Sequence, residues 1–348
     1  MLSRRTRPLA HALTAAALLI PLAACSSDSG SGSGSDDPAG KAGASAAGFP
    51  YTVTNCGEKT TFDAPPKRAV TMNQHVTEIL LALGLEDRVA GTAYLDDKIL
   101  PRYEKAYESR PVLAKEYPSY EKLLAANPDF VYGGYASAFA AGDGRSRDAL
   151  AKSGIKSRLN IEGCAKKPVT MDDLYREVRE AGATFGVRDR AEKWIRGAEA
   201  ELAAAAKKPA ETAKSGASGA SGKPGESGEP PAVFVYDSGD KTAFTAGGRG
   251  IGNDIIERAG GRNIMSDLDK SFGDASWETV VDRRPDVIVI YDYGATTVDQ
   301  KKKRLLGDPA LKDVPAIKNK RFAVLPLSDV VLGVRAPGAV RKLAEQLR

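Results

Sequence analysis

Tyrosines recur at the ends of the apolar runs that predict β-strands in this chain. They are Tyr94, Tyr132, Tyr135, Tyr236, Tyr291 and Tyr293. A tyrosine offers a flat apolar face together with a hydroxyl group that can donate a hydrogen bond. Parallel α/β sheets bind ligands beyond the carboxyl ends of their strands, so these residues predict a site for a large, partly planar ligand. The alternative interpretation is that they are half-buried packing residues.

Polar residues complete the predicted ligand-binding set. Asn73, Gln74 and His75 follow a predicted strand, and Arg249 and Arg335 lie in glycine-containing loops. An arginine can bind a carboxylate or a phosphate through two parallel hydrogen bonds. The alternatives are that His75 is a solvated loop residue and that both arginines are solvated.

The residue types argue against catalysis and against a resident metal. His75 is the sole histidine beyond the leader, whereas zinc or manganese sites need several histidine and carboxylate ligands. A lone histidine does not make a Ser-His-Asp set, and the glycines of 248–252 resemble a dinucleotide motif only loosely. We therefore predict a protein that is not an enzyme and holds no cofactor or metal. Bare ferric iron bound by tyrosinates stays open as a lesser alternative.

Two pairs of similar segments organise the chain. Residues 119–132 and 276–290 each begin with a serine, an aromatic residue and a glutamate, and continue through Pro-Asp into an apolar strand. Upstream of each copy, 77–84 and 253–260 share a polar cap, an acid, an apolar pair and a final glycine. Repetition in the same order predicts two similar α/β lobes. The alternative is that helix-Pro-Asp-strand is ordinary punctuation of α/β chains.

Composition divides the body of the chain into segments. Residues 49–168 are predicted to form a first lobe, two capped helices follow at 169–208, and 232–348 form the second lobe. Residues 209–231 are rich in Ser, Gly and Ala and predict a disordered insert. The helix after Asp189 spans roughly 30 Å, about one domain diameter, and is predicted to be the single rigid connection between the lobes.

Local signals place smaller elements within the lobes. The pattern predicts a hairpin at 51–62, a loop at 73–76 and a helix at 77–83. Ser276 is expected to cap a helix because its hydroxyl can accept from the first backbone N–H groups. Pro285 is expected to end that helix, because the residue before a proline is pushed toward extended geometry.

The N-terminus carries the marks of an export signal. Three arginines precede an apolar run at 9–22, which is too short and alanine-rich for a membrane span, and the run ends in Leu22-Ala23-Ala24-Cys25. This ending resembles the lipobox of bacterial lipoproteins, which implies a signal peptide at 1–24 and lipid on Cys25. Residues 25–48 are predicted to be a disordered tether. The alternative is an ordinary secretory signal with an incidental cysteine, exported by the general or the twin-arginine route.

Charge and cysteine content restrict the class of protein further. The formal net charge is +5, and much of it comes from Arg4, Arg5 and Arg7 in the leader. A nearly neutral body argues against nucleic-acid binding. Beyond Cys25 only Cys56 and Cys164 remain, and an even pair in an exported protein predicts a disulfide; two buried free thiols are the alternative.

Taken in order, these features resemble the substrate-binding proteins of ABC importers for iron–siderophore complexes, haem and cobalamin. The matching pieces are the lipobox, residues 65–68, 77–84 and 119–132, the long helix after Asp189, residues 259–261, and 276–290. The resemblance covers essentially all of 50–348. It implies an α/β fold of two similar Rossmann-like lobes joined by one long helix, with the ligand cleft between them. The insert at 209–231 departs from the family pattern.

The resemblance also implies a role and partners. The protein would be a monomer, anchored to the outer face of the cell membrane through Cys25, that delivers an iron–siderophore complex to an ABC permease. Glu78 and Glu278 match the glutamates with which the family docks onto permease arginines, and Glu121 is the internal counterpart of Glu278. The alternative for both is that they are first-turn acids favoured by the helix dipole. Cobalamin or another corrinoid, a deazaflavin-type precursor, and a surface adaptor or sensor that transports nothing are the alternative functions.

Overall fold

The computed structural model describes residues 47–212 and 229–348. The predicted signal peptide, Cys25 and most of the tether lie outside the described residues, as do positions 213–228 of the predicted insert. Among the described residues, no helix has the length and apolar character needed to cross a bilayer.

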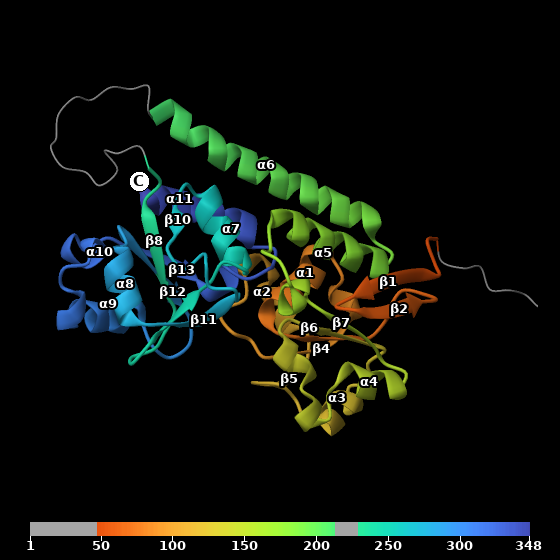
Figure 1. Cartoon of the computed structure of the whole chain (residues 1–348). Coiled ribbons are helices and arrows are strands. Elements are labelled where there is room, and N and C mark those ends of the chain that lie inside the picture. Colours follow the sequence, from red (N-terminus) through yellow and green to blue (C-terminus); the bar gives the residue numbers. More distant parts are fainter. Residues whose placement is uncertain (1–46, 213–228) are drawn as a thin grey trace, which may run out of the picture. The chain divides into compact units, whose positions relative to one another are not determined.

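The first lobe is built on a five-stranded parallel sheet of order β5-β4-β3-β6-β7 (Figure 1). The strands are β3 (Ala69–Met72), β4 (Val89–Ala93), β5 (Val112–Ala114), β6 (Phe130–Gly133) and β7 (Lys156–Leu159). Every residue of the central strands β3 and β6 is buried, as expected for a parallel sheet covered on both faces. The helices are α1 (Gln74–Ala82), α2 (Pro101–Glu108), α3 (Tyr120–Ala125) and α4 (Arg147–Lys152).

The second lobe repeats this plan with a four-stranded parallel sheet of order β10-β8-β12-β13. Its strands are β8 (Ala232–Tyr236), β10 (Arg262–Asn263), β12 (Val287–Asp292) and β13 (Phe322–Pro326), and β9 (Ala243–Ala246) pairs with β11 (Phe272–Ala275) beside them. Its helices are α7 (Ile251–Arg258), α8 (Trp277–Arg283), α9 (Val298–Leu306), α10 (Pro315–Lys318) and α11 (Ala336–Leu347). The prediction of two similar α/β lobes is confirmed.

A hairpin and a disulfide fasten the edge of the first sheet. β1 (Tyr51–Asn55) and β2 (Glu58–Phe62) form the predicted hairpin. The Asn55 side chain exchanges two hydrogen bonds of 2.9 Å with the backbone of Leu159, at the end of β7. Cys56, in the hairpin turn, is bonded to Cys164 in the short helix η4 (Ile161–Cys164), so the predicted disulfide is present.

Two consecutive helices follow the first lobe. They are α5 (Met171–Thr184) and α6 (Arg188–Thr212). α6 packs against α5 and against α11 of the second lobe (Figure 1). It continues to Thr212, so the first residues of the predicted insert belong to this helix.

The apolar core is continuous between the lobes. One cluster of buried residues joins α1 of the first lobe and the following helix α5 to β12, α7 and α11 of the second lobe, and it includes Val330, Val331 and Leu332. A further apolar cluster fills the outer layer of the second lobe, and another fills that of the first. The lobes therefore share buried apolar surface, which stabilises their association.

Candidate functional site

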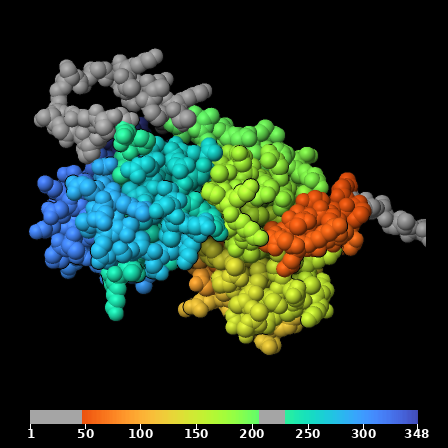
Figure 2. All heavy atoms as spheres, viewed as in Figure 1, coloured from red at the N-terminus to blue at the C-terminus, as the bar shows by residue number. Residues whose placement is uncertain are grey.

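A pocket of about 540 Å³ lies between the lobes, beyond the carboxyl ends of β4, β12 and β13 and against α2. Residues that follow β4 line it from the first lobe, and residues at the ends of β12 and β13 line it from the second. These residues include Leu95, Asp97, Lys98, Asp292, Pro326 and Arg335. Figure 2 shows the atoms of the second lobe, in cyan, lying directly against green and orange atoms of the first. The pocket is therefore shared, as predicted for a cleft at the strand ends.

Aromatic side chains of the first lobe gather beyond the ends of β3, β4 and β6, outside the lining of this pocket. The rings of Tyr94 and Tyr117 lie 4.6 Å apart, and the Tyr117 hydroxyl donates a 2.9 Å hydrogen bond to Asn73 Oδ1. The rings of His75 and Tyr135 lie 5.0 Å apart. Tyr94, Tyr117 and Tyr135 are all half-buried. Tyr117 was missed by sequence reasoning because it precedes a helix cap and follows no strand directly.

The second lobe contributes a tyrosine paired with a buried carboxylate. The Tyr293 hydroxyl donates to Asp237 Oδ1 at 2.5 Å, and Lys301 Nζ lies 4.8 Å from the centre of the Tyr293 ring. Burial raises the pKa of Asp237 above its usual range. Burial raises the pKa of Tyr135 well above its usual range, and the carboxylates of Asp96, Glu162 and Asp237 raise it further. Carboxylates of both lobes therefore raise the pKa of the Tyr135 hydroxyl.

Three of the predicted tyrosines are core residues. Tyr132 is fully buried and its hydroxyl donates to Glu177. Tyr291 is also fully buried, and Tyr236 is 3 % exposed with its hydroxyl donating to the Gly239 carbonyl at 2.9 Å. The prediction that Tyr132, Tyr236 and Tyr291 line the site is corrected, because their rings fill the sheets and present no free face.

Asn73, Gln74 and His75 are buried, and they shape the cleft from beneath. Asn73 has a φ of 91°, a left-handed conformation at the end of β3. Gln74 Nε2 donates to the Lys98 carbonyl at 2.8 Å, and Gln74 Oε1 accepts from the Asp97 amide at 2.9 Å. These bonds fix the loop that lines the pocket. The predicted loop at 73–76 is wrong from Gln74 onward, because α1 begins there.

The His75 imidazole is neutral at physiological pH. Burial lowers its pKa to about 4, since the charged form loses its hydration. The side chain is therefore an aromatic wall beside Tyr135, and the alternative of a solvated loop residue is wrong.

Both predicted anion-binding arginines already have partners. Arg335 Nε and Nη2 donate to the Glu78 carboxylate at 2.7 and 2.5 Å, and Nη2 also donates to the Lys98 carbonyl at 2.6 Å. Arg249 Nε donates to Asp269 at 2.9 Å. The prediction that Arg335 binds a carboxylate or phosphate of the ligand is corrected, because its guanidinium group is held in a buried ion pair with Glu78. Arg249 is paired with the exposed Asp269 at the surface, and its role in anion binding stays a prediction.

The remaining charges at the site are mostly acidic. Carboxylates of Asp96, Asp97, Asp237 and Asp292 lie at the strand ends, and Lys98 and Lys301 are the nearby ammonium groups. Burial raises the pKa of Asp96 to about 6. Lys301 Nζ donates to the Tyr291 carbonyl at 2.6 Å. In the part of the chain that the structure describes, no cluster of three His, Cys, Asp or Glu side chains is arranged to hold a metal ion. The site is aromatic and acidic, and it suits an uncharged or cationic ligand.

Comparison with known proteins agrees with this two-lobed cleft. Residues 70–328 match the model of the family described as "Periplasmic binding protein". The chain belongs to the periplasmic binding protein family. A crystal structure of a periplasmic binding protein from Veillonella parvula is 31 % identical, with a TM-score of 0.73 over 85 % of this chain and 96 % of that one.

Two curated relatives of this periplasmic binding protein are more distant. YvrC of Bacillus subtilis, named an uncharacterised ABC transporter substrate-binding lipoprotein, is 24 % identical over 86 % of each chain. A protein of Halobacterium salinarum, named cobalamin-binding protein, is 27 % identical over 70 % of this chain and 59 % of its own length. The family resemblance predicted from the sequence is therefore confirmed.

The two glutamates predicted to dock this periplasmic binding protein onto a permease differ in accessibility. Glu278 is exposed in the first turn of α8. Glu78 is 1 % exposed and bonded to Arg335, so the docking prediction for Glu78 is corrected: a carboxylate held in a buried ion pair is not available to another chain. Glu121, the counterpart of Glu278 in the first copy of the repeat, is exposed in the first turn of α3.

Proposed function

We propose that this protein captures a metal chelate of neutral or positive charge, in the first place a ferric trihydroxamate siderophore, and delivers it to an ABC permease. The observation that carries the proposal is the composition of the cleft. Half-buried tyrosines and the carboxylates of Asp96, Asp97, Asp237 and Asp292 lie at its strand ends, and Arg335, which lines it, is bonded to Glu78.

Charge separates the possible chelates. Three hydroxamates neutralise ferric iron, and a pendant amine makes the complex cationic, whereas a ferric tris-catecholate is a trianion. Bringing a trianion against desolvated carboxylates such as Asp96 and Asp237 is unfavourable, because charge interactions are strong where water is excluded. The same argument disfavours a phosphate-bearing deazaflavin precursor. The faces of the tyrosine rings would pack on the apolar parts of a neutral or a cationic ferric trihydroxamate.

Cobalamin is the second candidate ligand. A relative that carries this ligand in its name shares 27 % identity with the chain. A corrinoid is large, partly planar and not anionic, so it meets the same charge criterion as a ferric trihydroxamate.

A ligand panel followed by tyrosine and tryptophan fluorescence tests the proposal. The panel contains a ferric trihydroxamate, the same siderophore without iron, a ferric tris-catecholate and cyanocobalamin. Saturable quenching by the ferric trihydroxamate with none by the tris-catecholate is expected. Saturation by cyanocobalamin alone would establish the second candidate instead. Preferential binding of the tris-catecholate would refute the charge argument.

Delivery to a permease is tested separately from capture. Glu121 and Glu278 occupy equivalent first turns in the two lobes, so opposed carboxylates would orient the protein on permease arginines. Glu121→Arg combined with Glu278→Arg is expected to abolish uptake of the labelled chelate and to leave its affinity unchanged. Glu345→Arg, the same charge change at an exposed position of α11, is the control. Undiminished uptake in the double variant would favour an adaptor or sensor.

The proposal keeps Cys25 as the lipid attachment site.

A further inference from the structure

A loop of the second lobe is buried against the first lobe. Residues 330–335 connect η6 (Leu327–Asp329) to α11, and Val330, Val331 and Leu332 are each at most 2 % exposed. Such burial requires partners for the backbone N–H and C=O groups of the loop. The first lobe supplies both partners of Leu332, whereas the Val330 amide donates to the Leu327 carbonyl within the second lobe.

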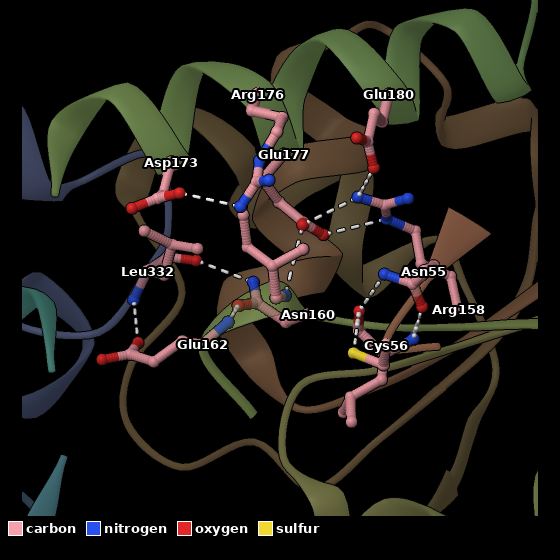
Figure 3. A network of polar contacts seen from close by, with 12 residues as sticks. Asn55, Cys56, Arg158, Asn160, Glu162, Asp173, Arg176, Glu177, Glu180 and Leu332 are labelled. Atoms are coloured by element: carbon pink, nitrogen blue, oxygen red, sulfur yellow. Dashed lines mark hydrogen bonds and ion pairs between the residues drawn. The ribbon is translucent and has the colours of Figure 1, made fainter. Parts of the chain in front are cut away.

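Glu162 of the first lobe accepts hydrogen bonds from two backbone amides of the second, and Figure 3 shows the one from Leu332. Its Oε2 accepts from the Leu332 amide at 2.7 Å, and its Oε1 accepts from the amide of Ile251, the first residue of α7, at 2.9 Å. Asn160 Nδ2 donates to the Leu332 carbonyl at 2.9 Å. One carboxylate therefore joins the loop and the beginning of a helix to the first lobe, with charge-assisted hydrogen bonds.

The turn that carries Glu162 is held independently of the second lobe. Cys164 is bonded to Cys56 of the hairpin. The Ile161 amide donates to Glu177 Oε2 at 3.2 Å, and Glu177 is itself paired with Arg158 at 2.8 Å (Figure 3). The Glu162 carboxylate is thus presented from a fixed support.

Other contacts of the loop are equally close. A Cβ atom on Gly333 would lie 2.9 Å from His75 Cβ, so α1 and the loop touch without room for a side chain. Arg335, the last residue of the loop, is bonded to Glu78 of α1. We call the contacts of Glu162, Asn160, His75 and Glu78 with residues 251 and 330–335 the joint. Tyr135, which packs on His75, lies on the first-lobe side of the joint. Helices α7 and α11 of the second lobe begin at the joint.

We propose that Glu162 is a positioning residue that sets how the second lobe sits on the first, and through this the spacing between the tyrosines of the two lobes. The effect on ligand affinity rests on the proposed function, whereas the effect on the position of the lobes does not.

Glu162→Gln is the variant that tests this proposal. It keeps the size of the side chain but turns one acceptor oxygen into an NH₂ donor, so one of the two amides loses its partner. Spin labels are placed at Lys122→Cys on α3 and Lys303→Cys on α9, both exposed; Cys56 and Cys164 do not react while they are bonded. We expect a broader and shifted distribution of distances between the labels. Affinity for the ferric trihydroxamate should also fall, because the tyrosines of the two lobes lose the spacing that fits the ligand, and fluorescence titration measures this loss.

Two further variants separate positioning from general loss of stability. Gly333→Ala is expected to shift the same distances from the opposite side of the joint. Ser146→Ala, which removes the cap of α4 within the first lobe, is expected to lower the unfolding midpoint without changing the distances. An unchanged distance distribution in Glu162→Gln overturns the proposal. If the wild-type protein binds no trihydroxamate, the proposed function fails while the distances still decide the role of Glu162.

Discussion

Burial of carboxylates is the main residue-level feature of the cleft. Asp96, Glu162 and Asp237 belong to loops that follow strands, and burial raises the pKa of each above its usual range. Their acidity could not be predicted from residue type alone, because desolvation depends on residues far away in the chain. The positions of Asp96 and Asp237 could be predicted, since each comes just after an apolar run that predicts a strand, whereas Glu162 lies in the short helix η4.

Asp96 should make stability depend on pH. Its pKa is about 6 in the folded protein and 3.8 as the reference value, so the folded state binds this proton more tightly. Stability is therefore highest when Asp96 is protonated, and it falls as the pH rises through about 6. Asp96→Asn should remove roughly 1.4 kcal/mol of this loss between pH 5 and 7.5, measured by urea unfolding. Exposed Asp313→Asn should follow the wild-type profile; a profile of Asp96→Asn parallel to wild type would contradict the assignment.

Tyr132 and Tyr293 should respond differently to loss of the hydroxyl. Tyr132→Phe leaves buried Glu177 without one donor and is expected to cost about 1–3 kcal/mol of stability with ligand affinity unchanged. Tyr293→Phe removes the donor to Asp237 at the cleft and is expected to weaken chelate binding several-fold. Urea unfolding and fluorescence titration of both variants check this. Equal effects of the two variants on affinity would show that Tyr132 reaches the ligand.

At the scale of elements, helix starts were predictable where the cap is local. Ser119 and Ser276 accept from the amides of Lys122 and Thr279, three residues on, and both are visible in the sequence. The sequence predicts that α1 begins at Thr77, which is three residues too late. The amide of Gln74, the first residue of α1, donates at 3.4 Å to Asp96, which lies in the loop after β4. α7 likewise begins at a carboxylate from the other lobe, Glu162. Caps supplied from distant positions leave no local signal.

Ser119 and Ser276 are equivalent helix caps in the two lobes, so their contributions to the free energy of unfolding can be compared directly. Ser119→Ala and Ser276→Ala each remove an acceptor from the first turn of a short helix that precedes a Pro-Asp-strand segment. Each is expected to lower the free energy of unfolding by about 1 kcal/mol, measured by urea unfolding with an unchanged m-value. Restoring the acceptor with Ser276→Asp should recover most of the loss. No change in Ser276→Ala would mean that water replaces the cap.

At the scale of the molecule, the duplicated plan was predictable and the joint between the lobes was not. Two copies of a helix-Pro-Asp-strand pattern indicate two lobes whatever their contacts. The joint is made by pairs such as Asn160 with Leu332 and Glu78 with Arg335, which are 172 and 257 positions apart. Each of these residues taken alone suggests another role, and Arg335 was accordingly predicted to bind ligand. Only the folded chain shows that charges of opposite sign meet there.

The buried pair of Glu78 and Arg335 should couple the unfolding of the two lobes. Their side chains are 1 % and 8 % exposed, so removing one partner leaves the other charge buried. Glu78→Leu or Arg335→Met alone is expected to cost about 3–5 kcal/mol, and the double variant clearly less than the sum. Urea unfolding of the four proteins gives the coupling energy. Each single variant should also split or broaden the transition, because the charge it strands lies at the joint and penalises association of the lobes. Additive losses with one sharp transition throughout would mean that the shared apolar core alone holds the lobes together.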